Sequence, residues 1–216
     1  MDVFFETAFE LWGESFSWAE VVGAVTGVIC VWWVAREVIW NFPMGLANNV
    51  FLLVLFLDAK LYADGVLQVL FFALGVYGWV VWVRGDGGGP DGDQEPVRRT
   101  TALEWRVLGA AGAVLWAVAY IWLDHHTDSP VPIWDSLALA LSLVATYGQA
   151  KKLLESWWVW IAVDIVSVPL FLDRGLPLIA LLYLVYGVIC VKGLKDWSRS
   201  LARRSVPAAL VVGGRS

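Results

Sequence analysis

The sequence predicts an all-α membrane protein in which seven transmembrane helices form a parallel 3+1+3 repeat. Of its 216 residues, 59% are hydrophobic and only 16% are charged, whereas a soluble domain has about 25% charged residues. Several runs of about 18 residues carry almost no charge, and each is long enough to cross a bilayer. A sequence pattern in residues 56–79 also recurs in residues 171–194. These three observations predict the fold class.

The apolar runs are expected to be helices, because a lone run in lipid can satisfy its backbone hydrogen bonds only in that form. The segment before them, 1–16, carries three glutamates and lacks the basic start of a signal peptide. It is expected outside the cell and is compatible with a short amphipathic helix at the membrane surface. The predicted spans are 17–35, 40–57, 63–83, 107–123, 133–150, 156–172 and 176–193.

These spans divide the chain into two triplets with a connector between them. Residues 17–83 hold the first triplet, 107–123 the connector and 133–193 the second triplet. The linker, 84–106, contains the run GDGGGPDGDQEPV, whose composition cannot bury a core and favours flexibility. The last segment, 194–216, is a basic tail.

Lysine and arginine indicate the orientation. Of the 15 basic residues, only Lys60 and Arg174 fall on the side where the predicted topology places the N-terminus. Because basic residues are retained on the cytoplasmic side, the N-terminus is predicted outside and the C-terminus in the cytoplasm. The basic tail is therefore interpreted as a topology determinant near anionic lipid, and no nucleic-acid partner is expected.

The internal repeat is visible in FLDAKLYADGVLQVLFFALGVYGW (56–79) and FLDRGLPLIALLYLVYGVICVKGL (171–194). Both begin with Phe-Leu-Asp at a short outside turn and continue into a span with a Tyr-Gly pair, Tyr77-Gly78 and Tyr186-Gly187. One inserted span makes both triplets point the same way. This is the arrangement of sugar-transporter-type, SWEET-like folds, whose substrate site lies near the midplane between the repeats.

The main candidate for a functional group is Asp164, halfway along the sixth span. An ionisable residue at the bilayer centre costs about 2.5–3.5 kcal/mol, so it indicates function by default. Superposing the repeats at Phe-Leu-Asp, 56 on 171, gives an offset of 115 residues and places Asn49 opposite Asp164. Asn48 lies beside it. Two structural alternatives remain: Asp164 pairs with another buried polar group, or the asparagines join helices by hydrogen bonds.

Two tryptophans share the helix face of the aspartate. Trp157, Trp160 and Asp164 have the spacing i, i+3, i+7 and fall within about 60° of one another. Indole faces stack on flat rings and attract positive charge, so this face suits a planar, cationic ligand. The alternative for Trp157 is the aromatic belt at the membrane interface.

Motifs of catalysis are absent from the sequence. It contains no HExxH, P-loop or GxSxG pattern, so we expect neither an enzyme nor a nucleotide-driven pump. The two cysteines, Cys30 and Cys190, lie in separate apolar runs and are interpreted as buried small residues. No metal or other cofactor is expected.

Two long segments, 40–82 and 127–172, resemble the PnuC family of bacterial vitamin transporters. The most specific part is W-x-x-W-x-x-x-N/D, which reads here as Trp157, Trp160 and Asp164. The stretches LYADGVLQ and YGW in the third span also match. The resemblance implies a homotrimer in the bacterial inner membrane. It also implies facilitated diffusion of an unphosphorylated vitamin.

Within that family the segments TDSP and WDS resemble the nicotinamide riboside group most. A cationic pyridinium with a ribose fits stacking indoles and a hydrogen-bonding acid. Thiamin and riboflavin remain alternatives. So do a proton-coupled carrier with Asp164 as its proton site, and a non-transporting sensor, which would need a larger cytoplasmic segment. The residues expected to line the site are Asp164, Trp160, Trp157, Asn48, Asn49, Gln68, Tyr77 and Tyr183.

Overall fold

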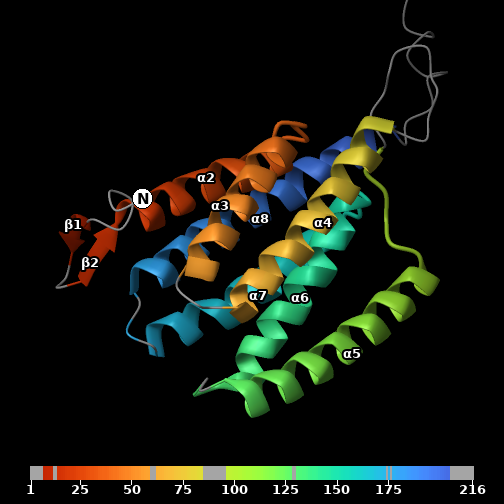
Figure 1. The fold of residues 1–216 in the computed structure, drawn as a ribbon. Coiled ribbons are helices and arrows are strands. Elements are labelled where there is room, and N and C mark those ends of the chain that lie inside the picture. Colours follow the sequence, from red (N-terminus) through yellow and green to blue (C-terminus); the bar gives the residue numbers. More distant parts are fainter. Residues whose placement is uncertain are drawn as a thin grey trace, which may run out of the picture.

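The computed structural model describes residues 7–11, 14–58, 62–84, 96–127, 130–173, 175 and 177–204. Within them the chain forms seven helices and one short hairpin (Figure 1). Each predicted span corresponds to one helix. The helices are α2 (Trp18–Ala35), α3 (Asn41–Asp58), α4 (Tyr62–Arg84), α5 (Ala102–His126), α6 (Pro132–Ala150), α7 (Ser156–Asp173) and α8 (Pro177–Arg204).

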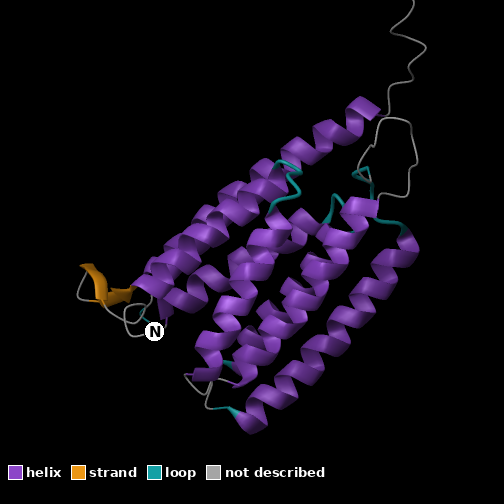
Figure 2. Ribbon diagram, turned by 45° about the horizontal axis from the view of Figure 1, so that its top comes forward, coloured by secondary structure: helices purple, strands orange, loops and turns teal. Residues whose placement is uncertain are grey.

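The segment before the first helix differs from the expectation. Strands β1 (Thr7–Leu11) and β2 (Glu14–Ser17) pair antiparallel, so an amphipathic helix over this part of the chain is wrong. The strands are four and five residues long, which is too short for hydrophobic periodicity to separate a strand from a helical turn. Figure 2 shows the hairpin beyond the end of the helical bundle.

Six of the helices form a closed ring. Packing runs from α2 to α3, α4, α6, α7 and α8, and α8 packs against α2 again. The fourth helix, α5, packs on α6 at the edge of the bundle, where both views show it (Figures 1 and 2). It has no buried residue. The first three and last three helices thus face each other, and the connector lies outside the ring.

The protein is a multi-pass membrane protein by the length and composition of its helices. Among the described residues, four helical segments are long and apolar enough to cross a bilayer: Gly65–Arg84, Ala102–His126, Ser156–Asp173 and Pro177–Arg203. A shorter apolar segment, Val21–Ala35, lies in α2. Since unsatisfied backbone groups are costly in lipid, helices are the form expected for such segments.

The turn after α2 and the turn after α6 have the same backbone structure at an offset of 115 residues. Glu37 and Lys152 occupy equivalent positions and both adopt a left-handed conformation, with φ of 56° and 48°. The three hydrogen bonds that close each turn have N···O distances of 3.1, 3.0 and 2.8 Å in both cases. They run from Arg36, Glu37 and Val38 to Trp32, Val34 and Trp33, and from Lys151, Lys152 and Leu153 to Tyr147, Gln149 and Gly148.

The same offset relates aromatic contacts further along the helices. Phe42 meets Trp82 edge to face, with centroids 5.0 Å apart and planes at 83°. Trp157 and Trp197, each 115 positions later, meet at 5.3 Å and 84°. The contact between α3 and α4 thus recurs between α7 and α8 at a constant offset of 115 residues.

Glycines permit this close packing in both halves. A Cβ on Gly78 would lie 2.7 Å from the ring of Phe42, and one on Gly193 would lie 2.6 Å from Trp157. Gly78 and Gly193 are again 115 apart. The Tyr-Gly pairs at 77 and 186 are 109 positions apart, so they do not occupy equivalent positions at the offset of 115.

The largest buried cluster lies at the end of the bundle that holds these two turns, which we call the basic end. Every described lysine and arginine lies at this end, in a turn, in the last residues of the linker or in the adjoining part of a helix. The cluster combines aromatic and aliphatic side chains from both halves. Its buried members are Val34, Ala35, Trp82, Val97, Leu154, Trp157, Ile189, Cys190 and Trp197.

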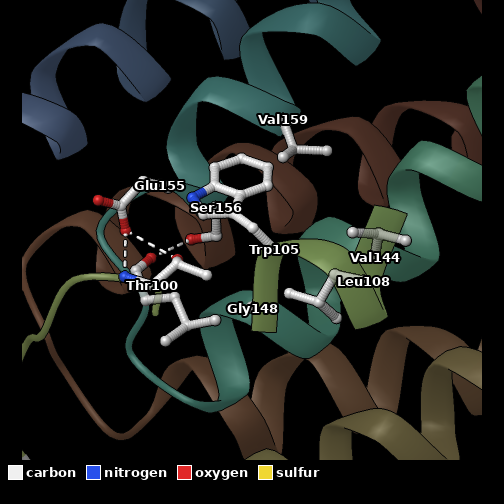
Figure 3. A pocket seen from close by; sticks show the side chains of 9 residues that line it. Thr100, Trp105, Leu108, Val144, Gly148, Glu155, Ser156 and Val159 are labelled. Atoms are coloured by element: carbon white, nitrogen blue, oxygen red, sulfur yellow. Dashed lines mark hydrogen bonds between the residues drawn. The ribbon is translucent and has the colours of Figure 1, made fainter. Parts of the chain in front are cut away.

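The end of the linker is docked here as a strap, residues 97–101. Arg98 pairs with the segment after Lys152: its N–H donates to the Lys152 carbonyl at 3.1 Å, and its carbonyl accepts from Leu154 N–H at 2.9 Å. The N–H and the hydroxyl of Thr100 both donate to Glu155 at 2.8 Å (Figure 3). The strap therefore ties the start of α5 to the start of α7. The middle of the linker, 85–95, lies outside the described residues.

Candidate functional site

One face of α7 points into the ring. Trp157 is 0% exposed and Asp164 is 6% exposed, whereas Trp158, on another face, is 58% exposed. Trp160 is partly buried and packs against the core cluster. The helical spacing therefore orients the aspartate and the two tryptophans as a common inward face, at increasing distance from the basic end.

Asp164 is enclosed mainly by α8. A Cβ on Gly187 would lie 3.6 Å from its Oδ2 atom, an ordinary contact distance, so α8 passes directly beside the carboxylate. The Cys190 thiol lies within hydrogen-bonding reach of Asp164, and Tyr183 lies close to it. Nevertheless Oδ2 is buried and has no hydrogen-bond partner among the described residues. Leaving a buried acceptor unsatisfied costs about 1–3 kcal/mol, more if it is charged.

The indole of Trp160 shows the same feature one helical turn away. Its Nε1 atom is buried and has no partner in the part of the chain that the structure describes. An unpaired donor and an unpaired acceptor thus lie on one helix face, four residues apart. Native proteins leave few such atoms, and each calls for an explanation. A ligand with hydroxyl or amide groups would satisfy both.

Trp157 lies deeper in the bundle wall, within the core cluster. Its ring packs against Trp197 and the backbone of Gly193. Along α7 it precedes Asp164 by seven residues, which is about 10 Å of helix. Trp157 therefore forms the closed floor below Trp160, on the side of the basic end.

The opposite wall of the ring is α3. Asn49 occupies the position equivalent to Asp164 at the offset of 115, and the backbone correspondence of the two turns supports that alignment. Asn48 Oδ1 lies 3.2 Å from the Thr26 hydroxyl, which also donates to the Val22 carbonyl at 2.7 Å. Asn48 is thus tied to α2, and Asn49 lies at the register of the acid.

The other predicted residues fall in two groups. Tyr183 belongs with Asp164: it stacks on Phe171 at 5.2 Å and lies within reach of Ser167. Gln68 lies in α4 fourteen residues before Trp82, which contacts Phe42 of α3, and at 3.6 residues per turn the two positions fall on nearly the same helix face. Tyr77 is placed elsewhere, since it stacks on Tyr147 at 5.9 Å between α4 and α6 near the basic end.

Four residues near the site were not anticipated: Thr26, Ser167, Tyr186 and Cys190. Ser167 follows Asp164 by three positions on the same face, so the i, i+3 spacing that linked Trp157 to Trp160 could have found it. Tyr186 meets Tyr183 edge to face at 5.9 Å, and its hydroxyl occupies the place of a Cβ on Gly27. Only the fold brings α2 beside α8, so sequence gave no signal for that contact.

The best-formed cavities do not coincide with this chemistry. One, of about 20 Å³, lies between α5, α6 and α7 beside the strap, where Trp105 and Ser156 line it (Figure 3). It is far smaller than a vitamin site, which needs about 300 Å³ or more. A second, of about 410 Å³, lies at the basic end. Neither is lined by Asp164.

Comparisons with known proteins agree on one group. A family model described as nicotinamide mononucleotide transporter matches residues 17–199. The chain is 28% identical to the nicotinamide riboside transporter PnuC of Escherichia coli K12, over 89% of this chain and 90% of that protein. It is 29% identical to the riboflavin/roseoflavin transporter RibM of Streptomyces davaonensis, over 93% of each. A crystal structure of the vitamin B3 transporter PnuC matches with TM-score 0.68 and 27% identity, over 87% of this chain and 83% of the other.

Proposed function

Because this chain belongs to the nicotinamide mononucleotide transporter (PnuC) family, which is a family of transporters and not of enzymes, we propose that it carries nicotinamide riboside across the membrane by facilitated diffusion. The vitamin would enter in its unphosphorylated form. No nucleotide-binding motif is present in the sequence, so the concentration gradient drives the proposed movement.

Four buried side-chain atoms of the described residues have no hydrogen-bond partner, and two of them, Trp157 Nε1 and Trp197 Nε1, lie in the core cluster. The observation that carries this proposal is that the other two, Asp164 Oδ2 and Trp160 Nε1, lie one helical turn apart on the inward face of α7. Nicotinamide riboside offers a cationic ring, an amide and ribose hydroxyls. The ring would stack on Trp160, where a cation is favoured. A hydroxyl would donate to Asp164, and a second polar contact would come from Asn48, Asn49 or Gln68. The two walls of the ring thus supply different contacts.

The carboxyl group of Asp164, which a bound cation would favour in its charged form, favours a cationic vitamin over a neutral one. Riboflavin has no positive charge, so it gains less from a carboxylate in a low-dielectric site. Sequence identity does not separate the two vitamins, since the chain is as similar to RibM as to PnuC. Riboflavin therefore remains the second candidate. Thiamin is also cationic and is a third member of the comparison.

Movement would follow from the two corresponding halves of the ring. We propose that all seven helices cross the membrane as a parallel 3+1+3 repeat, supported by the shared turns. Rocking of 17–83 against 133–193 would expose the site to each side in turn. The N-terminus would lie outside and the C-terminus in the cytoplasm, because the described basic residues gather at one end.

The assembly proposed from the family is a homotrimer in the bacterial inner membrane. The structure leaves α5 without buried residues, so its outer face is available to lipid or to another copy. Mass measurement of the purified protein in detergent tests the stoichiometry. A monomeric mass at all concentrations would contradict the trimer.

The test of function is uptake by purified protein in liposomes, combined with binding of nicotinamide riboside, thiamin, riboflavin and their phosphates. We expect saturable uptake of nicotinamide riboside, without nucleotide and without a proton gradient. Strongest binding of riboflavin would establish the second candidate. Uptake that collapses with an uncoupler would indicate a proton-coupled carrier, and binding without uptake would indicate a sensor.

A further inference from the structure

The two turns that share a backbone structure are also joined to each other. Lys152 Nζ lies 3.1 Å from Glu37 Oε2. The two residues are equivalent, at 37 and 152, and belong to opposite halves of the ring. When equivalent residues of two related halves meet, they lie near the axis that relates the halves. An ion pair at this place connects the halves where they face each other.

The surroundings make the pair more than a surface contact. The Lys152 side chain is 0% exposed, and its Nζ also lies 4.3 Å from the ring centroid of Trp82. Exposed ion pairs contribute little, but burial strengthens the attraction. Removing Glu37 therefore takes a carboxylate partner away from a buried charge, which is costly. Trp82 itself is held by a bond of 3.3 Å from its Nε1 to the Gln149 carbonyl.

The pair lies at the basic end, between the candidate site and the surface of the bundle at that end. Along the chain into α7 the order is Lys152, Trp157, Trp160 and Asp164, so the acid lies deeper in the bundle. The cleft of about 410 Å³ opens at the basic end. It reaches Glu37 and is also lined by Arg36 and Arg199. Solvent thus reaches the Glu37 side of the pair, and the core cluster covers the Lys152 side.

Other charges of the cleft are engaged along α8. Asp196 pairs with Lys192, and Arg199 Nη1 lies 3.6 Å from Asp196 Oδ1. These contacts lie within one helix, so they do not join the two halves. The Glu37–Lys152 pair does join them, and rocking that opens the basic end must separate it.

We propose that Glu37 and Lys152 form the latch of the gate at the basic end, closed in this structure and broken once in each transport cycle. The inference rests on the proposed function for its role in transport. The closed geometry itself does not depend on which vitamin is carried. Opening would expose both charges to the cleft, where water replaces the lost partner.

The protein carries its own reporter for this gate. Cys190 is 2% exposed, lies in the core cluster and is within reach of Asp164. It becomes the sole cysteine after Cys30→Ala, because the sequence has two. Its rate of modification by a membrane-impermeant methanethiosulfonate, added at the basic end, measures how often that end opens.

We expect Glu37→Gln in the Cys30→Ala background to raise the Cys190 modification rate about tenfold, as the closed population falls. The charge swap E37K/K152E should return the rate to within about threefold of the parent. Asp196→Asn is the matched control, because it removes an acid of the same cleft that does not join the halves. Thermal melts establish that each variant is folded.

An unchanged rate in Glu37→Gln, or an increase that Asp196→Asn reproduces, would overturn the latch. If the swap does not fold, the double neutral variant E37Q/K152Q takes its place. If the two residues are coupled, Cys190 in E37Q/K152Q should be modified no faster than in the faster of the single variants Glu37→Gln and Lys152→Gln. A rate increase equal to the product of the two single increases would overturn the coupling. Failure of the unmodified protein to move any vitamin sinks the proposed function alone, since the modification assay does not require transport.

Discussion

Trp82 and Trp197 stand 115 positions apart in the chain, and their ring centroids lie 6.3 Å apart with planes at 51°. They come from α4 and α8, the last helices of the two halves. Within the described residues these helices do not pack along their lengths, so the contact is confined to one layer. That layer, with Trp157 and Phe42, closes the basic end beneath Asp164.

The first prediction concerns the charge of Asp164. Asp164→Asn keeps the shape but loses a hydrogen bond to a charged group, worth about 1.5–3 kcal/mol, so affinity for nicotinamide riboside should fall about 10- to 100-fold. Asp164→Ala should abolish saturable uptake. Calorimetric binding and liposome uptake measure the two effects. Asp173→Asn, at the exposed end of the same helix, is the control, and equal losses in both variants would contradict the site.

The second prediction separates two neighbouring tryptophans. Trp160→Ala removes the ring that would stack on the vitamin, so binding should weaken about tenfold or more, given 0.5 to about 2 kcal/mol for a desolvated cation–π contact plus lost area. Trp158→Ala, on the exposed face, should change affinity less than about twofold. If both variants bind as the parent does, Trp160 is not part of the site.

The third prediction concerns the close approach at Gly193. Gly193→Ala places a Cβ 2.6 Å from the fully buried Trp157 ring, and overpacking of this kind costs about 1–3 kcal/mol. A thermal melt in detergent should show a lower Tm. Gly109→Ala in α5 meets no atom within 4 Å and should leave the Tm unchanged or raised. A normal Tm in Gly193→Ala would show that the layer yields easily.

The fourth prediction concerns pH and the strap. Arg98 donates two hydrogen bonds to Glu104, at 2.6 and 2.9 Å, and with the Thr101 N–H lowers the pKa of Glu104 from 4.5 to about 2. A lowered folded-state pKa stabilises the fold above the unfolded pKa, and this stabilisation is lost as pH falls from about 4.5 to about 2. The Tm of Glu104→Gln should therefore be lower than that of the parent at pH 7.

The difference in Tm between Glu104→Gln and the parent should narrow as pH falls from about 4.5 to about 2. Arg99→Gln is the control variant, because the Arg99 side chain is largely exposed and its Nη1 lies 3.9 Å from Glu155 Oε1. Its melt should follow the parent at every pH. A gap that stays constant down to pH 2 would show that the ionisation of Glu104 does not hold the strap.

The helices were predictable because their signal is composition, which lipid enforces directly. The inward face of α7 followed from spacing alone. The end of α8 was assigned to the tail, because residues 194–204 are rich in charge. Yet Leu194, Trp197 and Leu201 recur at helical spacing and pack on the core cluster, a signal that could have extended the helix.

Contacts between distant turns could not be predicted in the same way. Nothing in the sequence places Glu37 beside Lys152, because the pairing depends on how two halves meet. The strap is a similar case: its composition favours a loop, and its docking depends on the free edge after Lys152. The binding roles of all the residues expected to line the site remain predictions.

The shared turns are held by main-chain atoms, whereas the side chains at corresponding positions differ, as Arg36 and Lys151 or Val38 and Leu153 do. A duplicated frame that does not depend on its side chains can keep its hinges while each lining diverges alone. Opposite Trp160, for instance, the frame has Gly45 at the equivalent position. A change of cargo would then require substitutions on one wall only, which makes the α7 wall the place to engineer a different vitamin.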